Sequence, residues 1–504
     1  MRLATGFEAL KFALGVMITT MTDRRSLLRT GAALLAAGTA APFARAAASS
    51  TAPALDDPTI VRRALALHPG LYRYLSPRGF ERRMAQFERE WTASPDLAQR
   101  FLALSRLTAA VRCGHTQCNP FNQSKAVSTA LFERPTRLPF TFRWLGGRMV
   151  ITGDSGAMIG IARGSVVERI NGQSPQAMLD TLVRYARADG SNDAKRIAQM
   201  EMRGTEEFET FDIYQGLLFP PGAEGHRTVW REPGGSRRQA LLPTITAAQR
   251  NAAHPRRDDT GPLWDWRVDA DGIAVLTMPS WVTYHGNWDW QGWLTERLAA
   301  LGGAKGLVID LRENEGGTDC GTFLLERLIA KPFKPLRYDS RIAYRQTPAA
   351  LRPFLDTWDA SFHTLGESAK VDGHGNLVVD GDGGEDATIP AAPRIPVPTA
   401  VLIGPVNSSA TFSFARRVKQ AGAARLFGTA TGGNLRGING GAYFFVRLPQ
   451  SGLEFDLPIK GYYPERPQAD SGVNPDIMVV QTIADIAAGR DPAMTAARRY
   501  LLSR

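Results

Sequence analysis

The sequence predicts an α/β fold for its second half, preceded by a helical segment and by a small module of strands and helices. Three observations predict this. Residues 55–112 carry apolar side chains at three- and four-residue spacing. Near residue 170 a strand pattern leads through an Asn-Gly turn into a capped helix. From about residue 262, apolar strands alternate with helices, which is typical of a largely parallel sheet with crossover helices.

The composition is that of an ordinary globular chain. Of 504 residues, 43% are hydrophobic and 22% are charged, which excludes collagen-like, low-complexity and wholly disordered proteins. At about 150 residues per domain, the length suggests about three domains. The net charge is +11, and residues 1–48 contribute +4 of it. Because no Lys/Arg-dense run follows residue 48, we expect no nucleic-acid partner.

Residues 1–48 resemble a twin-arginine export signal, with an ordinary Sec signal as the alternative. Arg24-Arg25 precede a short stretch of small apolar residues, and Ala44-Arg45-Ala46 has the A-x-A pattern that a signal peptidase cuts. The stretch is too short and too rich in Ala and Gly to favour a permanent membrane span. We expect a mature chain that begins near Ala47, in the periplasm or outside the cell, with Met21 as an alternative start.

In the helical segment, the spacing of Phe80, Met84, Phe87 and Trp91 predicts one buried helix face. After a loop at residues 113–116, the chain enters the small module. There, residues 164–170 are predicted as a strand, Asn171-Gly172 as a turn and Ser174 as a helix cap. This order resembles the second half of a PDZ-type module, whose groove adds a peptide strand to a sheet edge; a spacer domain is the alternative.

The α/β region contains four predicted strands and three predicted helices. The strands are residues 272–278, 306–311, 400–403 and 425–427, and the helices are residues 294–301, 321–330 and 410–420. Residues 349–396 interrupt the alternation and are rich in Gly, Asp and Pro. We interpret them as a surface insertion or lid.

Three cysteines are too few for a disulfide framework. A bridge between Cys113 and Cys118 is chemically possible in an oxidising compartment and would stiffen the loop around His115. Three buried, unbridged thiols, with Cys320 as the third, are the alternative.

Two segments carry the groups that acyl-transfer chemistry requires. That chemistry needs a hydroxyl at a helix N-terminus, an imidazole to take its proton, and backbone amides that face the developing oxyanion. The strand at residues 400–403 leads into a helix opened by Ser409, where the amide of Ala410 lacks a helical partner. The strand at residues 306–311 ends in Gly316-Gly317, whose amides are candidate oxyanion donors. Simple capping by Ser409 and its neighbour Ser408 is the alternative.

The order of four motifs resembles that of C-terminal-processing and tricorn-type serine peptidases. The motifs are Asp-Leu-Arg-x-Asn-x-Gly-Gly at 310–317, the strand-to-Ser-Ala segment at 401–410, the glycine-rich segment at 428–433, and Gly-Val-Asn-Pro-Asp-Ile at 472–477. The resemblance covers roughly residues 55–500. It implies a crotonase-like (ClpP/crotonase) α/β core, Ser409 as the nucleophile, and oxyanion donors at Ala410 and at Gly316 or Gly317.

The resemblance also indicates which base is used. The processing branch has a lysine 25 residues after the serine, and this position is Asn434 here, so a Ser–Lys dyad is not expected. The tricorn branch has a histidine in a Gly-His-Thr-like motif, which His115 matches. In that branch a serine beside the histidine and an acid near the Gly-Val-x-Pro-Asp motif orient the ring. Gly114 replaces the serine here, and the acid is Asp470 or Glu465, with Asp470 preferred.

The resemblance implies a serine hydrolase that cleaves peptides or unfolded proteins through an acyl-enzyme, with no metal or organic cofactor, and the N-terminal signal predicts that it is exported. The alternative is an inactive peptide- or lipid-binding protein on the same scaffold. The expected organisation is a signal (1–48), a helical domain with His115 (49–140), a PDZ-like domain (141–250) and a peptidase core (262–504) with the insertion at 349–396.

Overall fold

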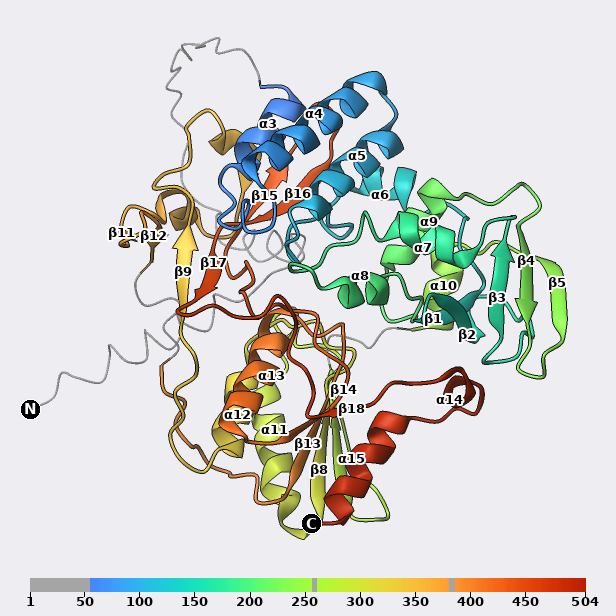
Figure 1. The fold of residues 1–504 in the computed structure, drawn as a ribbon, viewed down its shortest axis with the longest axis vertical. Coiled ribbons are helices and arrows are strands. Elements are labelled where there is room, and N and C mark those ends of the chain that lie inside the picture. Colours follow the sequence, from blue (N-terminus) through green and yellow to red (C-terminus); the bar gives the residue numbers. More distant parts are fainter. Residues whose placement is uncertain (1–54, 256–260, 380–385) are drawn as a thin grey trace, which may run out of the picture.

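The computed structural model describes residues 55–255, 261–379 and 386–504 (Figure 1). The export signal predicted for residues 1–48 therefore lies outside the described residues. Across those ranges, no helix has both the length and the apolar character that a membrane crossing requires.

Four helices open the described chain. They are α3 (Asp57–Leu65), α4 (Pro77–Ala93), α5 (Leu97–Ala110) and α6 (Lys125–Leu131). A side chain caps each of them at its N-terminus, as Ser76 does for α4 by accepting a hydrogen bond from the amide of Gly79. The predicted face of α4 is confirmed, because Phe80, Met84, Phe87 and Trp91 are all buried.

The helices share one apolar core with two strands from the far end of the sequence. These strands are β15 (Tyr443–Arg447) and β16 (Glu454–Pro458), and Figure 1 shows them beside α3 to α5. The same core includes buried residues of the module between residues 138 and 242. The loop after α5, which carries His115, is therefore fixed against strands from the C-terminal half. The domain boundaries given above stay predictions.

The module contains a five-stranded antiparallel sheet in the order β1-β2-β3-β4-β5. The strands are β1 (Phe140–Leu145), β2 (Arg148–Asp154), β3 (Val166–Ile170), β4 (His226–Arg231) and β5 (Arg237–Leu242); the helices are α7 (Pro175–Leu182), α8 (Asp193–Gln199), α9 (Thr210–Leu218) and α10 (Ala247–Ala253). The predicted turn and cap are confirmed. Asn171 and Gly172 have φ of 48° and 83°, and Ser174 accepts a hydrogen bond from the amide of Ala177.

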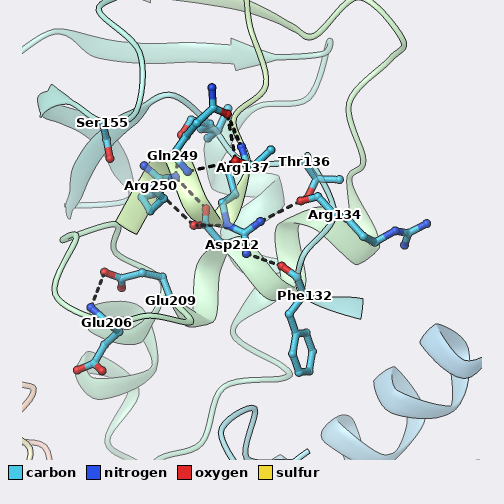
Figure 2. Close-up of polar contacts among 12 residues, drawn as sticks. Phe132, Arg134, Thr136, Arg137, Ser155, Glu206, Glu209, Asp212, Gln249 and Arg250 are labelled. Atoms are coloured by element: carbon cyan, nitrogen blue, oxygen red, sulfur yellow. Dashed lines mark hydrogen bonds and ion pairs between the residues drawn. The ribbon is translucent and has the colours of Figure 1, made fainter. Parts of the chain in front are cut away.

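A buried ionic cluster holds α9, α10 and β1 together (Figure 2). The Asp212 carboxylate accepts hydrogen bonds from Arg250 at 3.0 and 3.2 Å, and its Oδ2 lies 3.3 Å from Nε of Arg137. The two guanidinium groups also donate to backbone carbonyls, including that of Leu138 at 2.7 Å and that of Arg134 at 2.9 Å. These three side chains are therefore structural, since they connect elements and satisfy buried backbone groups.

The predicted α/β region forms a six-stranded sheet in the order β18-β14-β13-β8-β7-β6, parallel except for β6. The strands are β6 (Asp265–Val268), β7 (Ile273–Thr277), β8 (Gly306–Asp310), β13 (Thr399–Ile403), β14 (Arg425–Gly428) and β18 (Ile477–Met478). All four predicted strands are present. The mixed α/β fold is thereby confirmed at this level.

Helices cover both faces of this sheet (Figure 1). On one face lie α11 (Trp290–Ala299), the short 3-10 helix η1 (Ala300–Gly303), α12 (Cys320–Leu328) and α13 (Ser409–Ala421); on the other lies α15 (Pro492–Leu502), after the short α14 (Ile483–Ala487). Alternate strand residues enter the two cores, as Val401 and Leu402 do. Burial on both faces explains why these strands are continuous apolar runs.

The structure also contains two small sheets, in the orders β10-β15-β16 and β11-β12-β9-β17. Their further elements are β9 (Tyr338–Ile342), η2 (Arg352–Phe354), β10 (Leu355–Asp356), η3 (Ala360–Thr364), β11 (Lys370–Val371), β12 (Leu377–Val378) and β17 (Gly461–Pro464). Part of the stretch interpreted as a surface insertion is thus built into the fold. Leu355 pairs with Val446 of β15, and Phe362 is buried in the core of the N-terminal helices.

Candidate active site

Ser409 is the first residue of α13 and has a φ of 50°, in the left-handed region. A non-glycine residue in this conformation is strained by about 1–2 kcal/mol, and such strain is typical of functional positions. Ser409 is partly exposed, whereas Ser408 is 1% exposed. The Ser408 hydroxyl accepts a hydrogen bond from Lys195 Nζ at 2.6 Å and donates to the carbonyl of Glu315 at 3.2 Å. Ser409 is therefore the serine of this pair that a substrate can reach.

The Gly316-Gly317 turn faces Ser409. A Cβ atom added to Gly316 would lie 2.9 Å from Cβ of Ser409 and 3.2 Å from the amide nitrogen of Ala410, so a side chain is excluded there. The amide of Gly316 donates to Oδ1 of Asn314 at 2.9 Å. Within the described residues, the amides of Gly317 and Ala410 donate to no other residue. Of the two predicted donors in this turn, Gly317 is the one whose amide is available.

Two buried asparagines fix this turn to the start of α13. Nδ2 of Asn407 donates to the carbonyls of Leu311 and Asn314, and its own carbonyl accepts the amide of Gly432 at 2.6 Å. Asn314 accepts a hydrogen bond from the Thr411 hydroxyl at 2.7 Å. The backbone amides around Ser409 are thus held in place before any substrate binds.

Two cations bind Glu315, the residue before the glycine turn. Oε1 lies 2.8 Å from Nζ of Lys195, and Oε2 lies 2.9 Å from a guanidinium nitrogen of Arg187. Partial burial opposes ionisation of Glu315, but the two cations outweigh it and hold the pKa of this carboxyl well below its usual value. Glu315 is therefore an anion, and its ion pairs hold Lys195 of α8 and Arg187 of the segment after α7 beside this turn.

The same contacts bring the His115 loop to the serine. Arg187 donates to the carbonyl of Gly114 at 2.6 Å while it binds Glu315. The path from the histidine loop to Ser408, the neighbour of Ser409, therefore consists of Arg187, Glu315 and Lys195. One ionic cluster therefore connects the loop that carries the predicted base to the residue before the predicted nucleophile, although the two are far apart in the sequence.

The His115 ring is partly buried and lies 6.1 Å from the ring of Tyr443 on β15. Its Nδ1 atom is buried and has no hydrogen-bond partner among the described residues. Burial lowers the pKa of His115 to about 4; Asp189 acts against this, whereas Lys195 and Arg187 lower the pKa further. The imidazole is therefore neutral near pH 7, which is the form that accepts a proton.

The carboxylate beside His115 is that of Asp189. Its Oδ1 accepts a hydrogen bond from the amide of Gly114 at 2.8 Å, and a carboxylate oxygen lies within 4.8 Å of a ring nitrogen of His115. Asp470, the acid preferred from the sequence, instead accepts hydrogen bonds from Asn434 at 2.7 Å and from the amide of Ser191 at 3.1 Å.

Asp470 reaches the histidine loop only indirectly. Asn434 donates both to Asp470 and, at 3.2 Å, to the backbone carbonyl of Asp189. Glu465, the other acid considered, is exposed, and its amide bonds to the carbonyl of Arg337. Asn434 stands where the processing branch has its lysine and supports the Asp189 segment from this position.

Sequence reasoning did not identify Asp189, Arg187 or Lys195. No local signal marks them, because a charged side chain on a short helix or in a loop is ordinarily solvated. Lys195 is 0% exposed, and only the assembled structure shows this. The three cysteines are all free and buried, so the bridge between Cys113 and Cys118 is not formed.

Ser409 is accessible and strained and lies beside free backbone amides, and an ionic cluster connects its neighbour Ser408 to the loop of a neutral histidine. These features suit a serine-type peptidase, and comparison with known proteins assigns the protein to that class. Residues 272–479 match the model of Peptidase family S41, so the chain carries an S41 peptidase domain. The resemblance to C-terminal-processing and tricorn-type serine peptidases is confirmed. No curated protein sequence matches the chain significantly.

Two solved structures of CPAF share the fold of this chain. Mature CPAF complexed with lactacystin is 15% identical over 88% of this chain and 98% of its own, with a TM-score of 0.57. Mature CPAF alone is 17% identical over 88% and 96% of the two chains, with a TM-score of 0.53. The tricorn protease matches with a TM-score of 0.36, at 14% identity over 89% of this chain and 36% of its own.

Proposed function

We propose that this S41 peptidase hydrolyses peptide bonds through an acyl-enzyme formed on Ser409. Its Oγ attacks the substrate carbonyl while His115 takes the hydroxyl proton, and His115 then gives this proton to the leaving amine. The amides of Ala410 and Gly317 stabilise the oxyanion, each such donor contributing about 3 kcal/mol to transition-state stabilisation. The contacts from Gly114 through Arg187, Glu315 and Lys195 to Ser408 carry this proposal.

In this mechanism Asp189 positions His115. Its carboxylate lies close enough to the ring to hold it in one tautomer after a small adjustment, directly or through one water. Asp470 supports Asp189 through Asn434 and has no direct part in proton transfer.

Lys195 serves as a fixed cation. Burial lowers the pKa of Lys195, and Glu315 opposes this. Because its ammonium group already donates to Ser408 and pairs with Glu315, it fixes both groups and leaves proton transfer to His115.

Substitution of the two neighbouring serines tests the nucleophile. A fluorophosphonate probe should label the purified protein, and Ser409→Ala should abolish both labelling and turnover of an unfolded protein substrate. Ser408→Ala is the matched control, since it removes a hydroxyl one residue away; this variant should still be labelled, and His115→Ala should not. Labelling that depends on Ser408 instead of Ser409 would reverse the assignment. A wild-type protein that is neither labelled nor active would favour the ligand-binding alternative.

Cellular location and the details of the fold are part of the same proposal. We propose a crotonase-like core, a PDZ-like role for the five-stranded module in holding extended peptides, and export through the twin-arginine signal. In cell fractionation, replacement of Arg24 and Arg25 by Lys should retain the protein inside the cytoplasm. Export of the doubly substituted chain at the normal level would instead indicate the Sec route.

A further inference from the structure

Three metal-ligating side chains meet beside the proposed active site. The Cys113 thiol, one ring nitrogen of His115 and one carboxylate oxygen of Asp189 all lie within 4.8 Å of one another. Two come from the loop after α5 and the third from the segment between α7 and α8, so the fold itself brings them together. Sulfur, imidazole nitrogen and carboxylate oxygen are the ligands that Zn²⁺ takes in proteins.

Two of the three groups carry buried polar atoms with no partner. Asp189 is 1% exposed, and its Oδ2 receives no hydrogen bond from any described residue. Nδ1 of His115 is in the same state. Buried polar atoms in proteins are usually paired, so the two unpaired atoms in this group of three ligand-type residues leave capacity for a bound ion.

Backbone amides already orient the other atoms of these groups. The amide of Gly114 donates to Oδ1 of Asp189 at 2.8 Å, which leaves Oδ2 for a metal. The amide of His115 donates to Sγ of Cys113 at 3.4 Å and thus supports negative charge on the sulfur. Such outer contacts fix the direction of metal ligands and strengthen binding.

We propose that Zn²⁺ binds Cys113, His115 and Asp189 and thereby inhibits the peptidase. Zinc bonds of about 2.0–2.3 Å in tetrahedral geometry place ligand atoms about 3.4–3.7 Å apart, so separations of up to 4.8 Å need to close by at most about 1.4 Å. The thiol releases its proton to solvent, and the thiolate and carboxylate balance the charge of the ion. Water takes the fourth position.

The inhibitory part rests on the proposed function. The ion holds His115 through its ring and withdraws Asp189 from it, so the imidazole no longer accepts the Ser409 proton. The neighbouring cations do not prevent binding, because Arg187 and Lys195 are paired with Glu315.

Titration with Co²⁺ as a spectroscopic substitute for Zn²⁺ tests the site without reference to activity. Under oxygen-free, reducing conditions, the full chain should bind one Co²⁺ with a thiolate-to-metal charge-transfer band, and one equivalent of Zn²⁺ should displace it. Cys113→Ser should abolish the band, and Asp189→Asn should weaken binding about 10-fold or more. Cys118→Ser and Cys320→Ser are the matched controls and should keep the band. A band that survives Cys113→Ser, or no stoichiometric binding, would refute the site.

Two further measurements separate this site from the proposed function. Ser409→Ala should bind Co²⁺ as the wild type does, whether or not Ser409 is the nucleophile. In the active protein Zn²⁺ should inhibit and a chelator should restore the rate. Cys113→Ser should need at least about 10-fold more Zn²⁺ for half-inhibition, relative to its own metal-free rate. Stoichiometric binding without inhibition would contradict the inhibitory role while leaving the site intact.

Discussion

The carboxylates of Asp212 and Glu315 each bind two cations, yet they have different surroundings. Asp212, between Arg137 and Arg250, has a side chain that is 2% exposed. Glu315, between Arg187 and Lys195, has a side chain that is 43% exposed. The Asp212 cluster satisfies backbone carbonyls and connects elements, whereas the Glu315 cluster opens to solvent beside an accessible serine and a histidine with an unpaired nitrogen. An anion bound by two cations therefore has a structural role when it is fully buried. The same arrangement can contribute to a reactive site when it is exposed to solvent and lies beside unpaired polar groups.

The largest expected effect comes from opening the closed cluster. Asp212→Ala leaves two buried guanidinium groups without a counter-charge, and we expect it to lower the free energy of unfolding by about 3–5 kcal/mol. Chemical denaturation measures this. Glu168→Gln is the control, because Glu168 also binds two arginines, Arg231 and Arg237, but in an exposed pair. A similar loss of stability in both variants would show that burial does not distinguish them.

Substitution in the Glu315 cluster should reduce kcat/KM more than it reduces the free energy of unfolding. In Glu315→Gln, Arg187 and Lys195 lose the anion that ties the histidine loop to the serine turn. We expect kcat/KM to fall by about 10- to 100-fold, since small misplacements of catalytic groups have effects of this size. Unfolding and kinetic measurements on the same preparation check this. An unaltered kcat/KM would remove Glu315 from the path between base and nucleophile.

Asp189→Asn should lower kcat/KM by about 10-fold because the imidazole loses its orienting carboxylate. The variant should also move the acid limb of the pH profile to lower pH, since the Asp189 charge acts to raise the pKa of His115. Asp470→Asn provides the comparison and should have the smaller effect on both quantities. The reverse ranking would restore Asp470 as the orienting acid.

The smallest effect concerns the pH dependence of the wild type and of Lys195→Met. With the pKa of His115 at about 4, kcat/KM should hold between pH 5 and 7 and fall as the pH decreases through about 4, where the base becomes protonated. Lys195 lowers this pKa, so its removal should shift the acid limb to higher pH. Profiles of kcat/KM from pH 3.5 to 8 measure the shift. A wild-type limb near 6.5 would mean that the ring is more solvated than its surroundings indicate.

The sequence predicted those parts of the molecule that local patterns determine. Continuous apolar runs predicted β8 and β13, and Gly422, which has a φ of 60°, correctly predicted the end of α13. The serine turn was also found, through motifs that lie within the residues matched by the family model. The histidine loop, which lies outside those residues, was proposed from its resemblance to a Gly-His-Thr-like motif. Their pairing was an inference from resemblance, because no pattern within a segment records which segment lies opposite it.

The remainder of the site depends on contacts that no local pattern encodes. Lys195 is a lysine on a short helix, and its burial against Ser408 follows from how α8 packs. Asp470 was chosen by its position relative to a motif. In the structure, Asn434 donates hydrogen bonds both to the Asp470 carboxylate and to the backbone carbonyl of Asp189. The hydrogen bonds that Asn434 makes in this chain are not revealed by carrying family roles over position by position.

The left-handed backbone at Ser409 means that the stability of the fold and the proposed chemistry favour different residues at this position. Glycine adopts this conformation without steric penalty, so Ser409→Gly should relax the start of α13 while removing the proposed nucleophile. A substitution that increases stability at this position therefore removes the group proposed to act in catalysis. We therefore expect Ser409→Gly to be folded and at least as stable as the wild type while it has lost turnover, so that stability and activity change in opposite directions at this residue.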